Sequence, residues 1–523
     1  MRESEFDYVI VGAGTSGCVL AARLAAGGRN TVLVLEAGGF DRSIWIRIPV
    51  GFSKTFMNPK YGWGYQARYN PAMGERIVPW PRGRVVGGSG SINGLVYVRG
   101  QHADFDDWQA LSADGWSWRD VKPYFERAER DAHAVSKCGY RHPVCDAFID
   151  AAENLGYPRV DPESRDTELG AGYVHLSTDR GLRRSTAHAY LHPARRRGEV
   201  ALEVEAMVER IVIENGRATG VLYRQGGEIC RAKARKDVVL AAGAIGSPQL
   251  LQLSGIGPAS HLLGAGIDVV QDSPQIGENL QDHLAIRLVA RAKGVVTLNE
   301  MTRSFFRRAG MALEFALRRA GPMTIGAGMA TLYAPVVDPS GRPDVQFMIG
   351  PLSTDNPLQG MHAFPGMTTT ACQLRPRSRG FLRVMSPDPY THPSIVANYL
   401  SDELDRQVMV AQVRMGRKLY STPPLSDLVE SEHRPGREVE TDDEILDYAL
   451  RMSGSIYHPV GTCRMGSDPN APVDPELRVK GIRNLRVADG SVMPTLVSAN
   501  SNAACIMIGE KAADIITGAP PVQ

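Results

Sequence analysis

The sequence lacks several features that would assign it to a whole class of protein. It has no run of about 18 uncharged apolar residues, which a membrane-spanning helix requires. It has no strong excess of one charge, because 59 Lys and Arg residues face 57 Asp and Glu residues and leave a formal net charge of +2. Proteins whose main task is to bind nucleic acid or acidic lipid usually carry a marked basic excess, so neither is the expected main partner. The first residues, MRESEFDYVIVGAG, do not show the basic stretch, apolar run and cleavage site of a secretory signal.

Cysteine is scarce, and the seven cysteines are scattered along the chain. No two of them have the CxxC spacing of a zinc site, so we expect no metal. An odd number of isolated cysteines is typical of reduced, mostly buried thiols, which together with the missing signal predicts a cytoplasmic protein. With 43% hydrophobic and 22% charged residues, the composition is that of a globular protein of roughly two to four domains.

The first clear motif is a GxGxxG between two predicted strands. DYVIVGAG predicts a buried strand, SGCVLAARLAAG a helix and NTVLVLEAG a second strand. At the first junction, Gly12, Gly14 and Gly17 permit a tight turn and a close approach of backbone N–H groups to a pyrophosphate. Glu36 ends the second strand, where its carboxylate can accept hydrogen bonds from ribose hydroxyls and disfavours the 2′-phosphate of NADP. These residues predict a dinucleotide site, for FAD or NAD, that comprises Gly12, Gly14, Thr15, Ser16, Gly17, Glu36 and Ala37.

Later segments predict the surrounding architecture. ALEVEAMVERIVIENGRATGVLY predicts a β-hairpin that turns at Asn215 and Gly216, and KDVVLAAGAIGSPQLLQLSGIG predicts a strand, a tight turn and a helix. Residues 104–130 favour a helix. From about 290 to 455 the pattern changes to helical stretches such as 305–319 and to strands rich in Pro and Gly. This change predicts a separate α+β region inserted into the first domain.

Three widely separated motifs resemble the signatures of the glucose–methanol–choline (GMC) oxidoreductases, FAD-dependent enzymes that act mostly on alcohols. Residues 83–94 (GRVVGGSGSING) resemble the first signature, and residues 243–257 (GAIGSPQLLQLSGIG) resemble the second. Near the C-terminus, residues 457–462 (YHPVGT) precede 485–494 (LRVADGSVMP) and 500–502 (NSN), again as in the family. Weaker similarities are GENLQDHL, RPDVQF and LRPRSRGFLRV. The similarity therefore runs in family order along nearly the whole chain.

The resemblance implies an α/β fold, α+β overall, with a Rossmann-type FAD-binding domain and an inserted substrate domain. The inserted domain is expected to be built on an antiparallel sheet flanked by helices. In this arrangement the FAD-binding domain comprises residues 1–150, 196–290 and 455–523, and the substrate domain comprises 151–195 and 291–454.

The resemblance also assigns residues to FAD. A glycine-rich run such as GGSGSING lets backbone N–H groups approach a flat polar ligand closely. By similarity, the backbone at Val208 contacts the adenine, and Asp489 holds the ribityl–phosphate region. The residues implied beyond the fingerprint are Val86, Gly88, Asn93, Gly94, Leu95, Val96, Val208, Tyr457, Asp489, Ala499, Asn500 and Asn502.

The activity that the resemblance implies is oxidation of an alcohol to an aldehyde or ketone. His458 occupies the family's catalytic position and is expected to take the hydroxyl proton, because an unperturbed imidazole with a pKa of about 6.5 is available in its neutral form. The flavin N5 accepts the hydride. Asn500 aligns with the second catalytic position, where an amide can donate a hydrogen bond to the substrate oxygen but cannot take a proton. One titrating base is therefore expected.

Three departures from the family pattern narrow the prediction. Ile92 stands where members with covalent FAD carry the attaching histidine, so FAD is expected to be held noncovalently. Choline-oxidising members carry a glutamate in the strand ahead of RPD, whereas residues 326–337 contain no carboxylate. Choline would lack its counter-charge and is not the expected substrate. After Glu129, roughly two dozen residues of the usual family segment are missing, so the pocket wall or lid is expected to differ.

Other activities remain as alternatives. Some members of the family are lyases that cleave cyanohydrins without net redox change, and a flavin photoenzyme that decarboxylates fatty acids shares the fold. A binding protein on an inactive scaffold is a further alternative, although the presence of both His458 and Asn500 argues against it. The sequence leaves open which alcohol is used, whether oxygen or another acceptor reoxidises the flavin, and the oligomeric state.

Overall fold

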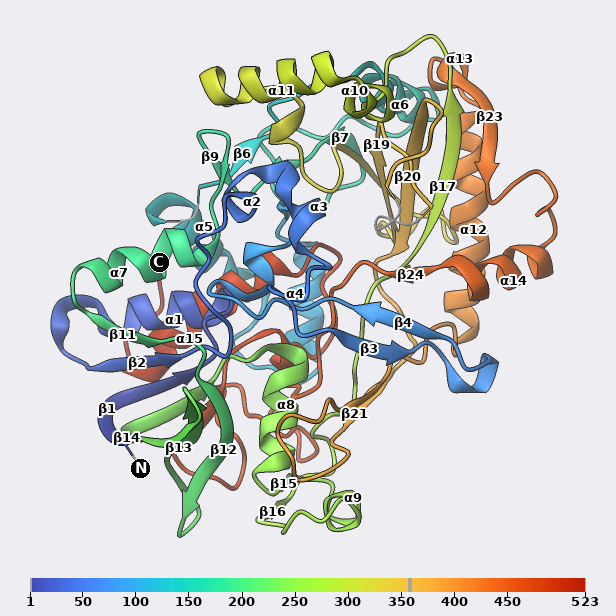
Figure 1. The fold of residues 1–523 in the computed structure, drawn as a ribbon. Helices are drawn as coiled ribbons and strands as arrows, with labels where there is room; N and C mark the ends of the chain where they lie inside the picture. Colours follow the sequence, from blue (N-terminus) through green and yellow to red (C-terminus); the bar gives the residue numbers. More distant parts are fainter. Residues whose placement is uncertain (1, 133, 356–359, 523) are drawn as a thin grey trace.

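The computed structural model describes residues 2–132, 134–355 and 360–522. These residues build two seven-stranded sheets, smaller sheets beside them, and helices that pack against both (Figure 1). This mixed architecture confirms the predicted α/β class with an additional antiparallel sheet. No helix in these ranges is long and apolar enough to cross a membrane.

The first large sheet is parallel at its centre. β1 (Arg2–Val11) pairs with β2 (Val32–Leu35) on one side and with β14 (Glu228–Leu240) on the other. β11 (Val200–Glu203) continues the sheet beyond β2, and β25 (Leu485–Val487) pairs with β14. The four residues of β2 are all buried, as expected of a strand covered on both faces.

The helix of the predicted β-α-β unit is α1 (Thr15–Ala25), which packs against α15 (Asn502–Thr517). Glycines allow α1 to lie close both to the loop that follows β1 and to α15. A Cβ at Gly17 would lie 2.0 Å from the carbonyl oxygen of Gly12, and a Cβ at Gly509 would lie 2.9 Å from the Cβ of Val19. Close packing of α1 aligns its N-terminus with the end of β1.

The predicted hairpin is confirmed. β12 (Met207–Glu214) and β13 (Arg217–Gln225) pair antiparallel, and Asn215 and Gly216 have φ angles of 52° and 68° at the turn. Two positive φ angles in a two-residue turn fit the right-handed twist of a hairpin. The hairpin extends the first sheet through pairing of β13 with β14.

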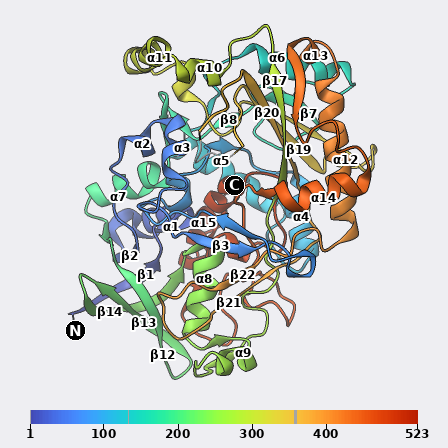
Figure 2. The ribbon, with the colours of Figure 1, turned by 45° about the vertical axis from the view of Figure 1, so that its right-hand side comes forward.

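The second large sheet is antiparallel. Its strand order is β23–β17–β20–β19–β18–β7, and β24 also pairs with β17. α6 (Pro143–Asn154) and α12 (Glu403–Tyr420) pack against this sheet and against each other, and Figure 2 shows α12 beside it. The strands are β7 (Gly170–Tyr173), β17 (Leu284–Ala292), β18 (Ala330–Ala334), β19 (Val345–Gly350), β20 (Gly366–Gln373), β23 (Val429–Arg434) and β24 (Gly454–Ser455).

The predicted domain segments can be compared with the sheets. β7, from the segment 151–195, pairs with β18 of the segment 291–454. The predicted boundary at residue 150 falls inside α6, and the boundary at 290 falls inside β17. The domain boundaries themselves stay predictions.

The region 104–130 contains two helices in place of one, α4 (His102–Ala110) and α5 (Trp118–Asp131). The other elements are α2 (Ile44–Arg47), α3 (Phe52–Thr55), β3 (Tyr65–Arg68), β4 (Ile77–Trp80), β5 (Val96–Tyr97), β6 (Ser136–Lys137), β8 (His175–Leu176), β9 (Thr178–Asp179), β10 (Leu182–Arg183), α7 (His192–Arg196), α8 (Gly243–Leu253), β15 (Ile256–Gly257), α9 (Ala259–Gly264), β16 (Gln271–Asp272), α10 (Leu298–Arg303), α11 (Phe305–Arg318), β21 (Phe381–Arg383), β22 (Ser394–Val396), α13 (Leu425–Leu428) and α14 (Asp442–Met452).

Candidate active site

A cavity of about 1010 Å³ is lined by residues of both large sheets. Val11 and Leu35 line it from the first sheet, and Met348 and Thr370 line it from the second. Its volume lies at the upper end of the range for ligand and cofactor sites. The cavity is therefore the candidate active site.

Most of the sequence-predicted site residues line this cavity. They are Gly12, Gly14, Thr15, Ser16, Glu36, Ala37, Gly88, Asn93, Gly94, Leu95, Val96, Val208, Tyr457, His458, Asp489, Asn500 and Asn502. Gly17, Val86 and Ala499 are buried or packed behind the lining instead. Val86 N–H donates to Gly39 O at 3.0 Å, and Ala499 N–H donates to Val497 O at 2.7 Å, so both hold the backbone of neighbouring loops.

Two glycine loops meet at the dinucleotide end of the cavity. A Cβ at Gly88, which has a φ of +55°, would lie 2.7 Å from the Cα of Gly14. A Cβ at Gly12 would lie 2.6 Å from the carbonyl oxygen of Ala241. α1 begins next to these loops with no side-chain cap and no acidic residue in its first turn, so its first N–H groups face the cavity unneutralised. This backbone arrangement fits a pyrophosphate.

Glu36 lies at the carboxyl end of β2, where the fingerprint predicts a ribose ligand. Its two carboxylate oxygens accept hydrogen bonds from Ala13 N–H and Gly38 N–H, each at 2.9 Å. Burial raises the pKa of Glu36 to about 7, although the two backbone hydrogen bonds favour the charged form. The two hydrogen bonds thus hold the Glu36 carboxylate in place in the cavity wall. A ligand that donates to this carboxylate would lower its pKa.

Asn93, in the first signature, is held by a buried arginine that the sequence analysis did not identify. Arg183 donates to Asn93 Oδ1 at 2.6 Å, to Asn93 O at 2.7 Å and to Gly90 O at 3.1 Å. Its fourth partner is the carbonyl oxygen of Ile46, at 2.9 Å. Burial lowers the pKa of Arg183 to about 9. Arg183 therefore fixes the loop that carries Asn93 and Gly94 against the cavity.

His458 and Asn500, the two predicted catalytic residues, lie in contact. Asn500 Nδ2 donates to His458 Nε2 at 3.2 Å. Burial, followed by the charges of His283 and Arg82, lowers the pKa of His458 well below its usual value, so the imidazole is neutral at pH 7. A neutral imidazole with one nitrogen facing a cavity is suited to accept a proton.

His283, a residue absent from the sequence-predicted site, fixes which nitrogen of His458 is the free base. His283 Nε2 lies 3.0 Å from Leu374 O and must donate, because a carbonyl oxygen only accepts. Burial lowers the pKa of His283 to about 4, so its Nδ1 is unprotonated and accepts from His458 Nδ1, 3.0 Å away. His458 consequently carries its proton on Nδ1 and presents Nε2 as the base.

The backbone of His458 is held as firmly as its ring. His458 N–H donates to Asp282 Oδ1 at 2.7 Å, and Asp282 Oδ2 accepts from Tyr399 and Ser455. Burial raises the pKa of Asp282 to about 6. Tyr457, the preceding residue, has a φ of 70°, which is rare for a bulky side chain and marks local strain. The three hydrogen bonds to Asp282 therefore position the base.

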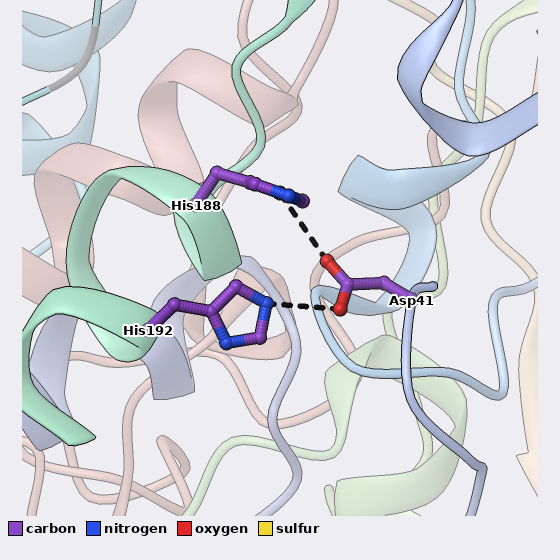
Figure 3. A group of neighbouring side chains, drawn as sticks. All are labelled: Asp41, His188 and His192. Carbon is purple, nitrogen blue, oxygen red and sulfur yellow. Dashed lines mark hydrogen bonds and ion pairs between the residues drawn. The ribbon is translucent and has the colours of Figure 1, made fainter. Parts of the chain in front are cut away.

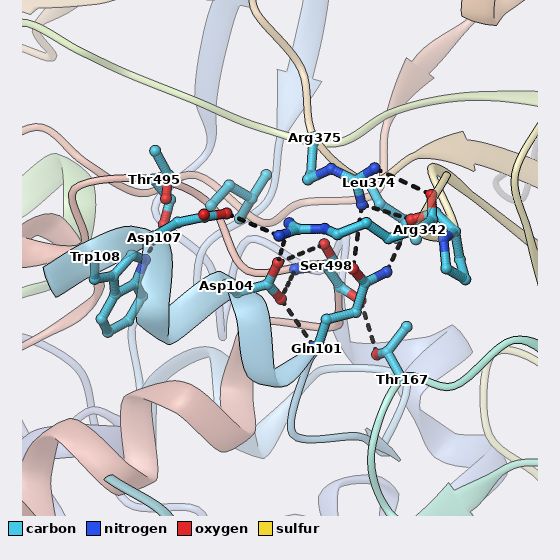
Figure 4. Close-up of polar contacts among 12 residues, drawn as sticks. Gln101, Asp104, Asp107, Trp108, Thr167, Arg342, Leu374, Arg375, Thr495 and Ser498 are labelled. Carbon is cyan, nitrogen blue, oxygen red and sulfur yellow. Dashed lines mark hydrogen bonds and ion pairs between the residues drawn. The ribbon is translucent and has the colours of Figure 1, made fainter. Parts of the chain in front are cut away.

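A second polar network holds the loop before Asn500 (Figure 4). Ser498 N–H and Ser498 Oγ donate to the two oxygens of Asp104, each at 2.7 Å. Thr167 Oγ1 donates to Ser498 O at 2.8 Å, and Arg342 donates to Asp104 Oδ1 at 3.1 Å. Within the described residues Asn500 Oδ1 is buried without a hydrogen-bond partner, which leaves a polar atom for a bound group to satisfy.

A carboxylate and two histidines meet outside the cavity lining (Figure 3). His192 Nε2 lies 2.9 Å from Asp41 Oδ1, and His188 Nδ1 lies 3.2 Å from Asp41 Oδ2. Their ligand atoms lie within 4.8 Å of one another, a separation that a metal ion could bridge. Ser185 also bonds His188 Nδ1, and the positive charges of Arg47 and Arg184 act on the same ring. These contacts connect Asp41, in the segment after β2, to His188 and to His192 at the start of α7.

The residues that the sequence analysis missed had a weak signal. Asp282 and His283 are the last polar residues of GENLQDHL, just before the apolar β17, and Arg342 opens RPDVQF. Both segments showed similarity to the family but no chemistry of their own. Their roles depend on partners 91 to 238 positions away in the sequence, which no local pattern indicates.

Comparisons with known proteins agree with this geometry. Residues 6–285 match the N-terminal GMC oxidoreductase family model, and residues 376–509 match the C-terminal one. The oxygen-dependent choline dehydrogenase of Photobacterium profundum is 38% identical over 545 residues, covering 99% of this chain and 94% of that protein. The mitochondrial choline dehydrogenase of Homo sapiens is 38% identical over 550 residues, with 99% and 90% covered.

Among solved structures, the formate oxidase of Aspergillus oryzae RIB40 superposes with a TM-score of 0.90 at 26% identity, covering 98% of each chain. The match therefore extends over both sheets and the cavity between their residues. The glycine loops, Glu36 and the unpartnered Asn500 Oδ1 fit the FAD that the family binds. The chain belongs to the GMC oxidoreductase family and is an FAD-dependent enzyme of alcohol-type oxidation.

Proposed function

We propose that His458 takes the hydroxyl proton of the alcohol and that Asn500 orients the alcohol oxygen. The observation that carries this assignment is the hydrogen-bond chain from Leu374 O through His283, which leaves His458 Nε2 unprotonated. Bound FAD supplies the acceptor for the hydride that leaves the same carbon. The Asn500 amide donates to His458 Nε2 in this structure. When the substrate hydroxyl donates to Nε2 instead, this amide becomes available to donate to the alcohol oxygen.

Anaerobic reduction of the bound flavin by alcohols tests this assignment. We expect His458→Gln to slow the loss of visible flavin absorbance by about 10²- to 10⁴-fold, the usual contribution of a general base. FAD content should stay unchanged. His261→Gln is the control, because His261 bonds Val384 O and lies outside the cavity lining. A His458→Gln variant that is reduced as fast as the wild type would remove the assignment.

We also propose that FAD is held without a covalent bond to the protein. Ile92 is buried in the cavity wall at the position where covalent members carry a histidine. His458 is the one histidine among the described residues that line the cavity, and it is engaged by His283 and Asn500. Denaturation should therefore release all flavin from the protein, and flavin that stays with the precipitated chain would contradict the proposal.

The charges in the cavity favour a neutral or anionic alcohol over a cationic one. Two carboxylates line the cavity within the described residues: Glu36 at the dinucleotide end, and Asp489, which accepts from Gly243 N–H at 2.8 Å and Ser247 Oγ at 2.6 Å. Arg287 of β17 also lines it, and its side chain has no hydrogen bond or ion pair in the described part of the chain. The lining cations are Lys54, Arg82, Arg287 and Arg308.

This charge distribution leads to a substrate prediction that differs from the names of the relatives. Choline dehydrogenases act on a quaternary ammonium, and such a cation would meet unpaired Arg287 here without a counter-charge. We expect 3,3-dimethylbutan-1-ol, the neutral isostere of choline, to reduce the flavin at least tenfold more efficiently than choline. We expect Arg287→Gln to narrow that difference. A clear preference of the wild type for choline would contradict the proposal.

The relatives named above are dehydrogenases and an oxidase, which supports oxidation over the lyase and photoenzyme alternatives. The electron acceptor follows from the same anaerobic experiment. Rapid recovery of flavin absorbance on readmission of air indicates oxygen, and slow recovery indicates another acceptor.

A further inference from the structure

The helix α11 has an unusual position at the edge of the molecule. It packs against α10 and the turn Pro322–Thr324, and both views show it projecting at the periphery (Figures 1 and 2). Phe315 is buried on its inner side, and Met311 lines the cavity. The inner side of α11 therefore belongs to the wall of the active-site cavity.

The outer side of α11 is apolar. At 100° per residue, its small and large apolar residues fall in one continuous arc. Four of them are large and highly exposed: Phe305 by 69%, Phe306 by 86%, Leu313 by 60% and Leu317 by 74%. Ala309 and Ala316 lie between them and are also exposed. No described element covers this arc, and a contiguous exposed apolar surface of this kind marks an interaction site.

The charges around the arc are almost all positive. Residues 303–319 hold five arginines and one carboxylate, Glu314. The arginines are exposed, and none forms an ion pair in the described part of the chain; they are Arg303, Arg307, Arg308, Arg318 and Arg319. By contrast, many arginines elsewhere on the described surface pair with Asp or Glu, among them Arg414 and Arg451. Unpaired arginines on both sides of an apolar helix face call for an anionic, apolar partner.

We propose that α11 docks in the plane of an anionic phospholipid bilayer. Phenylalanine and leucine would enter the boundary between headgroups and acyl chains, while the arginines contact lipid phosphates. A second copy of this chain is a poorer occupant, because a two-fold contact would place the arginines of one α11 against those of the other. Arg308, Met311 and Ala312 line the active-site cavity, so docking sets one end of that cavity at the lipid surface.

Sedimentation of the FAD-loaded protein with vesicles tests the proposal. The vesicles contain phosphatidylcholine alone, or phosphatidylcholine and phosphatidylglycerol in equal parts. We expect at least tenfold stronger binding to the anionic vesicles at about 0.1 M salt and a marked loss at about 1 M salt, where charges are screened. Phe305→Ser with Phe306→Ser should weaken binding at least tenfold. Arg307→Gln with Arg318→Gln should weaken it about fivefold per charge removed.

Matched control variants distinguish vesicle binding through α11 from nonspecific binding through other exposed side chains. Leu263→Ser with Met385→Ser removes two large apolar side chains that are 64% and 57% exposed elsewhere, and Arg414→Gln with Arg451→Gln removes two surface charges. Both controls should bind like the wild type, and all variants should keep the flavin-reduction rate in the absence of vesicles.

Three results would overturn the proposal. One is no binding to anionic vesicles, and another is equal loss of binding in the control variants. The third is a wild-type dimer that Phe305→Ser with Phe306→Ser converts to monomer without any vesicle binding, which would assign the face to a second copy.

Discussion

His283 Nδ1 lies 3.0 Å from His458 Nδ1, although the two residues are 175 positions apart in the sequence. The two imidazole rings are nearly perpendicular, at 81°. His283 Nε2 donates to the carbonyl oxygen of Leu374, so His283 Nδ1 must accept the hydrogen bond from His458 Nδ1–H. A buried histidine thus determines the tautomer of the catalytic one.

His283→Leu should slow flavin reduction by about tenfold or more, less than loss of the base itself, because His458 then loses the acceptor for its Nδ1–H. His283→Asn, whose amide oxygen can accept that hydrogen, should retain more activity. Stopped-flow reduction across a pH series measures both. If the Leu variant kept the wild-type rate and pH profile, His283 would have only a packing role.

The rate of flavin reduction should depend on pH in one direction. The pKa of His458 is well below its usual value, so the base is already neutral at pH 7 and gains nothing at higher pH. The limiting rate constant should therefore be flat from about pH 6.5 upwards and fall only in acid.

The stability of the folded protein should also fall in acid. His283 has a pKa of about 4 in the folded state, so between that value and about 6.5 the unfolded chain binds more protons and stability falls as pH falls. This residue alone should cost roughly 3 kcal/mol over that window. Thermal unfolding of wild type and His283→Leu from pH 7 to 5 would show the difference, and parallel curves for the two would contradict it.

FAD affinity should rise with pH through about 7. Burial raises the pKa of Glu36 to about 7, and ribose hydroxyls donate to a carboxylate, so binding favours the ionised form. Titration of the apoprotein with FAD, followed by quenching of flavin fluorescence, measures the affinity at each pH. Glu36→Gln should bind FAD more weakly and with little pH dependence. An unchanged pH dependence in this variant would assign the effect to another group.

Gly88→Ala should abolish FAD binding, because its Cβ would lie 2.7 Å from Gly14 Cα at a φ of +55°. Gly216→Ala is the matched control: its φ is +68°, but nothing lies within 4 Å of the added Cβ. The control should lose only about 1 kcal/mol of stability. Bound-flavin content and thermal unfolding of both variants test this, and a Gly88→Ala protein with full flavin content would refute the close approach of the two loops.

Asp104→Asn should lower both stability and the rate of flavin reduction. The buried carboxylate accepts two hydrogen bonds from Ser498, one from Arg342 and one from Gln101 N–H, and the amide cannot accept all four. We expect a loss of about 2 kcal/mol, typical of unsatisfied buried partners. Asp107→Asn breaks an exposed ion pair with the same arginine and should cost at most about 1 kcal/mol. Equal effects of the two substitutions would show that Asp104 does not position the Asn500 loop.

Much of the fold and part of the site could be predicted from local patterns. The GxGxxG with Glu36 follows from spacing along one β-α-β unit, and the Asn215–Gly216 turn follows from the φ angles that these residues tolerate. The prediction of a helix over 104–130 was wrong in one respect, since this segment forms two helices, α4 and α5, with the buried Trp116 between them. Burial of a large side chain in a loop is decided by the surrounding core, which local periodicity does not report.

Short stretches of sequence were enough to predict the dinucleotide-binding unit, the family, and His458 and Asn500 as candidate catalytic residues, because each prediction rests on residues close together in the chain. Which nitrogen of His458 is the base could not be predicted in this way, since that depends on His283 and Leu374 O. The folded chain also places Asp104 against Ser498, 394 positions away, and leaves the apolar face of α11 uncovered by any described residue. A net charge of +2 over the chain gives no sign of five arginines gathered around that face, none of them in an ion pair with a described residue. Proton positions and exposed surfaces are set by distances in space, and only the folded chain fixes those distances.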